Sequence, residues 1–109
     1  MLEQNILEEL QKVLIARKDA DSSESYVSSL YDKGLDQILK KVGEESSEVI
    51  IAAKGSDPRE LVKETADLWF HCMVLLVSQG LTINDVLNEL DQRFGISGHK
   101  EKANRSTQN

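Results

Sequence analysis

The chain has few of the residues that interrupt or cross-link a protein: one proline, one cysteine and six glycines among 109 residues. The single cysteine, Cys72, cannot form an internal disulfide and lies in an apolar run, as is typical of proteins in a reducing compartment. Because proline and glycine are scarce and Leu, Glu, Lys and Ala are abundant, helices are favoured. We therefore expect a helical, cytoplasmic protein.

A surplus of basic residues and a long apolar stretch are also missing. Nineteen acidic and 13 basic residues give a net charge of −6, whereas proteins that bind the DNA or RNA backbone usually carry a basic surplus. The longest apolar run, around residues 68–77, is much shorter than the roughly 20 residues that span a bilayer. The first residues show no secretory signal pattern. Neither nucleic acid nor a membrane is expected as a partner.

Hydrophobic spacing predicts a single all-α domain in residues 1–95, followed by a polar C-terminal tail, 96–109. Helices are predicted over about residues 2–18, 25–34, 34–54, 58–79 and 82–94. Capping residues and glycines set these limits: Ser25, Asp57, Thr82, Gly34, Gly55, Gly80 and Gly95. A bundle of four to five helices follows. Many chains this short bury more surface by pairing with a second copy.

Two acidic doublets stand out on the third and fourth predicted helices. Glu45 and Glu48, preceded by Glu44, form the first, and Glu64 and Asp67 form the second. The i, i+3 spacing places both carboxylates of a doublet on one side of a helix. Since the connecting turn is short, the helices should pack antiparallel and bring four carboxylates to similar heights. Acidic pairs are also common on solvated helix faces, which is the alternative explanation.

The helix predicted over 58–79 is apolar in nearly every direction, which predicts an interior helix. The exception is a narrow stripe that carries Glu64, Asp67 and His71. Burying unpaired carboxylates is costly, so the stripe should face partners, water or an ion. Magnesium is the natural counter-charge, because it takes oxygen ligands and shares its shell with phosphates. His71 either orients a metal-binding carboxylate or is an interior histidine with its hydrogen bonds satisfied.

The two doublets, on adjacent helices, resemble those of the MazG-like all-α nucleotide pyrophosphatases. Within that group, three segments are similar to the phosphoribosyl-ATP pyrophosphatases of histidine biosynthesis: Lys-Lys-Val-Gly-Glu-Glu-Ser-Ser-Glu-Val (40–49), Glu-Thr-Ala-Asp-Leu-Trp-Phe-His (64–71) and Val-Leu-Leu (74–76). The resemblance covers about residues 5–105. It implies Mg²⁺-dependent hydrolysis of phosphoribosyl-ATP between the α- and β-phosphates to phosphoribosyl-AMP and pyrophosphate. It also implies a homodimer built from a helix bundle.

Five acidic residues are the candidate catalytic group. Glu45, Glu48, Glu64 and Asp67 are predicted to hold one or more Mg²⁺ ions, which would neutralise phosphate charge and activate water. Glu44 either assists them, as a hydrogen-bond acceptor or general base, or is simply exposed.

Basic side chains near these acids are candidates for substrate binding. Lys40 and Lys41 begin a turn before the first doublet and could stabilise phosphate charge, or only decorate the helix. Further candidates for the phosphoribosyl end, each of which is also typical of a solvated surface, are Arg17, Lys18, Lys100, Lys102 and Arg105.

Two other functions fit the same residues. One keeps the chemistry but changes the substrate, as in a house-cleaning pyrophosphatase for non-standard nucleoside triphosphates. The other is a non-catalytic helical dimer that serves as a scaffold or binding module. The non-catalytic dimer predicts that replacing Glu64 or Asp67 by Ala leaves function intact. Stability would be unchanged or improved, because a repulsive cluster is relieved.

Overall fold

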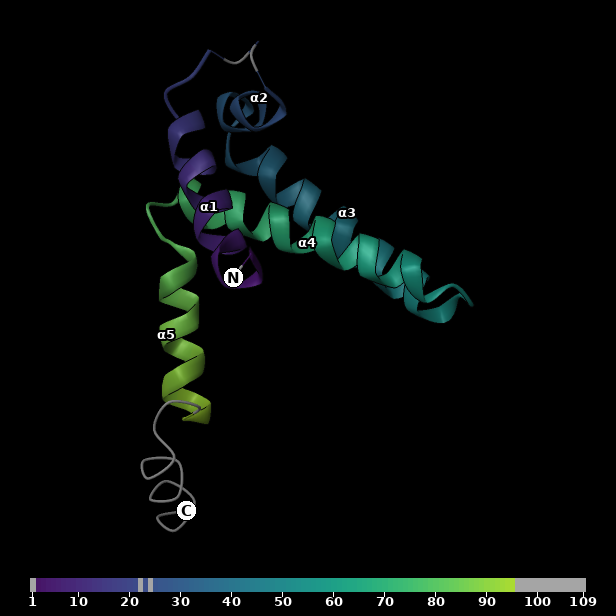
Figure 1. The fold of residues 1–109 in the computed structure, drawn as a ribbon. Helices are drawn as coiled ribbons and strands as arrows, with labels where there is room; N and C mark the ends of the chain where they lie inside the picture. The colour runs from purple at the N-terminus through teal and green to yellow at the C-terminus, as the bar shows by residue number, and fades with distance from the viewer. Residues whose placement is uncertain (1, 22, 24, 96–109) are drawn as a thin grey trace.

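The computed structural model describes residues 2–21, 23 and 25–95, and the chain folds into five α-helices there. In chain order they are α1 (Leu2–Arg17), α2 (Tyr26–Lys33), α3 (Leu35–Lys54), α4 (Pro58–Ser78) and α5 (Ile83–Phe94) (Figure 1). These described residues contain no strand, so the all-α prediction is confirmed. The predicted tail, 96–109, lies outside them.

Local hydrogen bonds explain where the helices begin and end. The side chain of Asp57 accepts a hydrogen bond from the amide of Arg59 at the start of α4. Thr82 and Asp85 form a reciprocal capping box at the start of α5. Gly34 joins α2 to α3 with a φ of 96°, a left-handed conformation that residues with a Cβ rarely adopt. The sequence signals for these boundaries are therefore confirmed.

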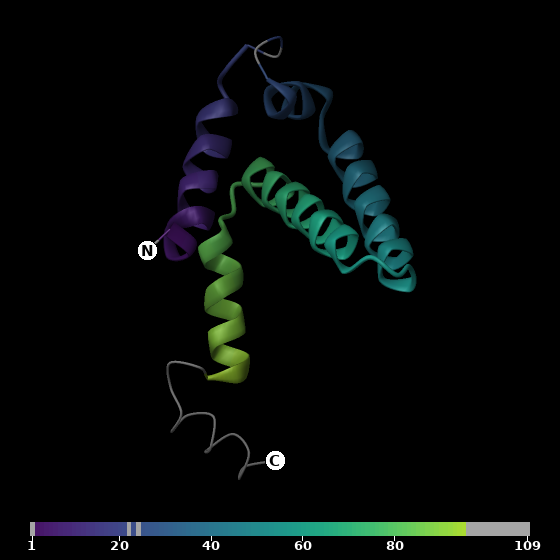
Figure 2. The same ribbon diagram turned by 45° about the vertical axis from the view of Figure 1, so that its right-hand side comes forward.

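Helices α3 and α4 run side by side as an antiparallel pair and make the most extensive contact in the molecule. Helix α2 lies across the end of this pair that is far from its turn, and α1 packs beside α2 and α4 (Figure 2). Helix α5 projects away from the other helices and contacts chiefly α1. The α3–α4 pair thus has one end packed by other helices and one end free.

The hydrophobic core lies at the packed end. It consists of Leu14, Val27, Leu30, Ile38, Met73, Val74 and Val77. The core members from α4 all come from its second half, and Lys18 adds a hydrogen bond there, from Nζ to the Val77 carbonyl oxygen at 3.1 Å. The same carbonyl, in the last turn of α4, also accepts a hydrogen bond from the Gly80 amide at 3.0 Å. The core therefore anchors one end of the α3–α4 pair and leaves its middle free to present polar groups.

The prediction that the fourth helix is interior is wrong for the first two-thirds of α4. Val62 is 70% exposed and Trp69 is 60% exposed. Within one chain, α4 packs mainly against α3 and α1, so apolar sectors of its surface have no cover. Apolar periodicity shows which faces favour burial, but it does not show whether the same chain supplies the cover.

In the part of the chain that the structure describes, no single helix is both long enough and apolar enough to cross a bilayer. Among the described helices, only α4 and α5 taken together have the length and the apolar composition of a membrane span. The two helices are bent by 106° at the break between them.

Candidate metal and phosphate site

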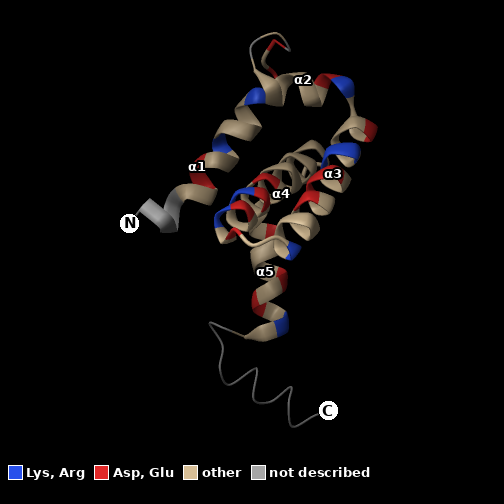
Figure 3. Ribbon diagram, turned by 90° about the vertical axis from the view of Figure 1, so that its right-hand side faces the viewer, with Lys and Arg blue, Asp and Glu red and all other residues tan. Residues whose placement is uncertain are grey.

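Three carboxylates meet between α3 and α4. Glu45 comes from α3 and Glu64 and Asp67 come from α4, and one oxygen of each lies within 4.8 Å of the others. Acidic residues line both helices where they run side by side (Figure 3). The antiparallel pairing that the short turn predicted is what brings residues from the two doublets together.

The geometry and chemistry of this cluster suit a divalent cation. Oxygens on opposite sides of Mg²⁺ lie about 4 Å apart, and those around the larger Ca²⁺ about 5 Å apart. The three oxygens lie within 4.8 Å of one another, so the group could hold a metal ion, and Mg²⁺ would require a slightly tighter arrangement. The ligand atoms are all carboxylate oxygens, which favours a hard cation such as Mg²⁺ over the nitrogen- and sulfur-rich sites typical of zinc.

The cluster is electrostatically unfavourable without a cation. Partial desolvation, followed by the charges of Asp67, Glu45 and Glu48, raises the pKa of Glu64 above its ordinary value. Neighbouring negative charges disfavour ionisation of a carboxyl group, and a bound cation reverses that effect. This is the electrostatic signature of a site that gains stability from a positive ligand.

Glu48 lies at the edge of the cluster rather than inside it. It is exposed, and it shares with Glu64 the lining of a hollow of about 370 Å³ that extends to the α3–α4 turn. Its charge still contributes to the raised pKa of Glu64. The expected meeting of four carboxylates is thus seen for three, because Glu48 sits almost one helical turn beyond Glu45, nearer the turn.

Lys41 places a positive charge beside the acidic cluster. Its Nζ lies 3.3 Å from Oε1 of Glu44, and its side chain is only 27% exposed, whereas Lys40 is exposed. Burial opposes the charge on Lys41, but the hydrogen bond with Glu44 and the nearby charge of Glu45 help to raise its pKa. The ammonium is therefore positive at neutral pH and close enough to Glu45 to interact with it.

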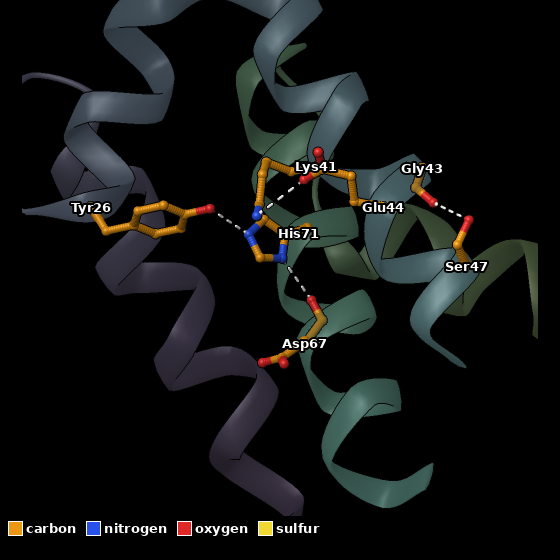
Figure 4. Close-up of polar contacts among 7 residues, drawn as sticks. All are labelled: Tyr26, Lys41, Gly43, Glu44, Ser47, Asp67 and His71. Carbon is orange, nitrogen blue, oxygen red and sulfur yellow. Dashed lines mark hydrogen bonds and ion pairs between the residues drawn. The ribbon is translucent and has the colours of Figure 1, made fainter. Parts of the chain in front are cut away.

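His71 is buried, and both of its ring nitrogens have partners. Nδ1 lies 2.8 Å from the backbone oxygen of Asp67, and Nε2 lies 2.8 Å from the Tyr26 hydroxyl (Figure 4). The Asp67 carboxylate points away from the ring, so His71 does not orient it by a hydrogen bond. Of the two roles expected for this residue, the structure shows the interior histidine with its hydrogen bonds satisfied.

Tyr26 is the residue near this site that sequence reasoning missed. It was not among the candidate site residues, and 45 positions separate it from His71. Its place directly after the helix-capping Ser25 fixes it at the start of α2, but no local pattern links it to α4.

Of the other basic candidates, Lys18 is bonded to the backbone at the end of α4. Lys100, Lys102 and Arg105 lie outside the described residues.

A helical pair with an oxygen-only acidic cluster, next to a partly buried lysine, is consistent with the all-α MazG-like fold. Residues 7–94 match the family described as phosphoribosyl-ATP pyrophosphohydrolase. The chain belongs to this family, and the enzyme class is a hydrolase acting on phosphoric anhydride bonds. The predicted family membership is therefore confirmed.

Curated relatives support the same assignment over almost the whole chain. A phosphoribosyl-ATP pyrophosphatase from Hydrogenovibrio crunogenus is 57% identical over 106 residues, covering 94% of each chain. One from Methylococcus capsulatus is 55% identical and covers 93% of this chain and 96% of its own. One from Neisseria gonorrhoeae is 54% identical and covers 94% of this chain and 95% of its own.

Proposed function

We propose that this protein hydrolyses phosphoribosyl-ATP between its α- and β-phosphates, with Mg²⁺ as cofactor, in the second step of histidine biosynthesis in the cytoplasm. The products are phosphoribosyl-AMP and pyrophosphate. The observation that carries the proposal is the cluster of Glu45, Glu64 and Asp67 beside Lys41, in a chain whose relatives are named phosphoribosyl-ATP pyrophosphatases.

In the proposed mechanism, Glu45, Glu64 and Asp67 hold the cation. When bound, Mg²⁺ neutralises phosphate charge and lowers the pKa of the attacking water. Lys41 contributes a fixed positive charge to a phosphate oxygen. As the water oxygen bonds to the α-phosphorus, the bond from this phosphorus to the bridging α–β oxygen breaks. The electron pair of that bond leaves with pyrophosphate.

Glu48 is the proposed acceptor of the proton that the water loses. It lies outside the three-carboxylate group but lines the hollow that it shares with Glu64. An exposed carboxylate there retains its ordinary access to solvent, so it can pass the proton on. Glu44, which is paired with Lys41 at 3.3 Å, instead holds that lysine.

We further propose that the enzyme works as a homodimer. An apolar groove of about 300 Å³ separates α4 from α5 and is lined by Leu7, Trp69, Cys72, Met73, Leu76, Ile83, Val86, Leu87 and Leu90. Helix α5 has no buried residue although it carries apolar side chains along one face. A second copy would cover both the groove and α5, which a single chain leaves in water.

A substrate panel tests the proposed reaction. Purified protein is assayed with phosphoribosyl-ATP and with standard and oxidised or deaminated nucleoside triphosphates, with Mg²⁺ and then with excess EDTA. We expect a kcat/KM highest for phosphoribosyl-ATP, with no turnover in EDTA. A higher kcat/KM for free triphosphates would favour a house-cleaning enzyme, and turnover that survives EDTA would refute the metal role.

Matched variants test the residues. Glu45→Gln, Glu64→Gln and Asp67→Asn should each abolish turnover while the circular dichroism spectrum stays unchanged. Glu8→Gln is the control, since Glu8 is exposed on α1 and lies outside the cluster. If the three variants are as active as the control, these carboxylates are not the catalytic group, whereas a wild-type protein without turnover on any substrate would favour the non-catalytic dimer.

A further inference from the structure

A chain of polar contacts connects α2 to α4 next to the candidate site. A backbone carbonyl can only accept a hydrogen bond, so Nδ1 of His71 carries the proton that is donated to the Asp67 oxygen at 2.8 Å. In the neutral imidazole, Nε2 is then an acceptor, and the Tyr26 hydroxyl donates to it at 2.8 Å. The histidine thus fixes the direction in which the tyrosine hydroxyl points.

The ring of Tyr26 is half exposed, and it makes one aromatic contact. It packs edge-on against His71, with ring centroids 5.7 Å apart and an interplanar angle of 84°. Phe70 also packs edge-on against His71, with ring centroids 5.1 Å apart and an interplanar angle of 87°. His71 is only 6% exposed, so the tyrosine contacts a buried residue of α4.

The oxygen of Tyr26, whose proton is directed to His71, remains able to accept a hydrogen bond from Lys41. The Lys41 side chain reaches toward the Tyr26–His71 pair (Figure 4). Burial raises the pKa of Tyr26, while the Lys41 charge and a side-chain hydrogen bond with it lower the pKa. Glu44 engages the same ammonium at 3.3 Å. An ammonium has three N–H donors, so Lys41 can engage Glu44, the Tyr26 oxygen and a third acceptor at once.

We infer that Tyr26, oriented by His71, is a positioning residue that holds the Lys41 ammonium beside the acidic cluster, with one N–H directed to a substrate phosphate. The inference rests on the proposed function, because it gives the lysine its phosphate. A lysine side chain has four rotatable carbon–carbon bonds, and a phosphate site needs it in one place. The tyrosine and Glu44 supply that placement before the substrate arrives.

The first test removes the hydroxyl and nothing else. Tyr26→Phe should lower kcat/KM for phosphoribosyl-ATP by about tenfold to a hundredfold, as loss of positioning does. Tyr31→Phe is the matched control: Tyr31 lies in the same helix, and its hydroxyl donates to the Leu14 carbonyl oxygen at 2.9 Å, in the packing between α2 and α1. Its kcat/KM should stay within about twofold of the wild-type value.

The second test asks whether Tyr26 acts through Lys41. In a double-mutant cycle, Tyr26→Phe should change kcat/KM by less than about twofold once Lys41→Met is present. The same four proteins are compared by the calorimetric Kd for pyrophosphate with Mg²⁺, so the cycle can be read even if Lys41→Met turns over too slowly to measure. A role in stability alone would not depend on the residue at position 41.

Three results separate the possibilities. If Tyr26→Phe leaves both kcat/KM and the pyrophosphate Kd unchanged, or if its effect persists with Lys41→Met, the inference is overturned. A loss in Tyr31→Phe equal to that in Tyr26→Phe also overturns it, because a general weakening of α2 would then explain both. Inactivity of the wild-type protein toward phosphoribosyl-ATP would instead refute the proposed function, and the pyrophosphate cycle would still decide the inference.

Discussion

Replacing Trp69 by alanine should disrupt the proposed homodimer. The side chain is 60% exposed in a single chain and lines the apolar groove between α4 and α5. Tryptophan presents roughly 250 Å² of surface, so roughly 150 Å² remains to be covered. At about 25 cal/mol per Å², full coverage contributes about 4 kcal/mol for each tryptophan.

A two-fold symmetric dimer buries this side chain twice, once from each copy. After allowing for the surface that alanine itself buries, the pair of truncations should weaken association by about 6 kcal/mol. Since about 1.4 kcal/mol corresponds to a factor of ten, the dimer Kd should rise by about 10⁴-fold. Ile15→Ala is the control, because Ile15 is 46% exposed on α1 and does not line the groove.

The assay uses the fact that Trp69 is the only tryptophan in the chain. Its fluorescence emission should shift to longer wavelength as the wild-type protein is diluted through its dimer Kd, because the indole then meets water. Sedimentation velocity at the same concentrations should show the dimer dissociate, and Trp69→Ala should be monomeric where Ile15→Ala is dimeric. An emission maximum independent of concentration, together with a Trp69→Ala variant that sediments like the wild type, would refute the reasoning.

Three further predictions concern the acidic cluster and a helix cap. Mg²⁺ at about one hundred times its Kd should stabilise the wild-type fold by about 2.7 kcal/mol, and a smaller rise in Tm is expected for Asp67→Asn; equal shifts would remove Asp67 from the metal site. The pKa of Glu64 is raised above its ordinary 4.5 in the fold, so ionisation of Glu64 destabilises the native state. This destabilisation is absent below pH 4.5 and complete above the folded pKa. Without metal, Glu64→Gln should therefore raise the Tm at pH 7 and leave it unchanged at pH 4, and a lowered Tm at pH 7 would contradict the repulsion. Thr82→Ala removes the capping box of α5 and should lower the free energy of unfolding by about 1 kcal/mol in a urea titration, whereas an unchanged value would show that α5 does not depend on its cap.

Much of the candidate site was predictable because its parts are local. The i, i+3 spacing of Glu64 and Asp67 places both on one side of α4 whatever that helix packs against. The short turn after α3 then restricts the partner helix to an antiparallel neighbour, which made a shared site with Glu45 foreseeable. That Glu45 rather than Glu48 is the third member of the cluster was not foreseeable, because it depends on how the two helices are aligned along their length.

The sequence by itself determined the helices, their limits and the presence of an acidic pair on each of two neighbours. Helical hydrogen bonds and caps connect residues only a few positions apart, so a short window of sequence contains the necessary information. Only the tertiary structure decided that Trp69 stays in water within one chain, and that the hydroxyl of Tyr26 reaches a histidine 45 positions away. Those outcomes depend on the packing of α1, α2 and α4 around a shared core, and packing between distant segments has no local signature in the sequence.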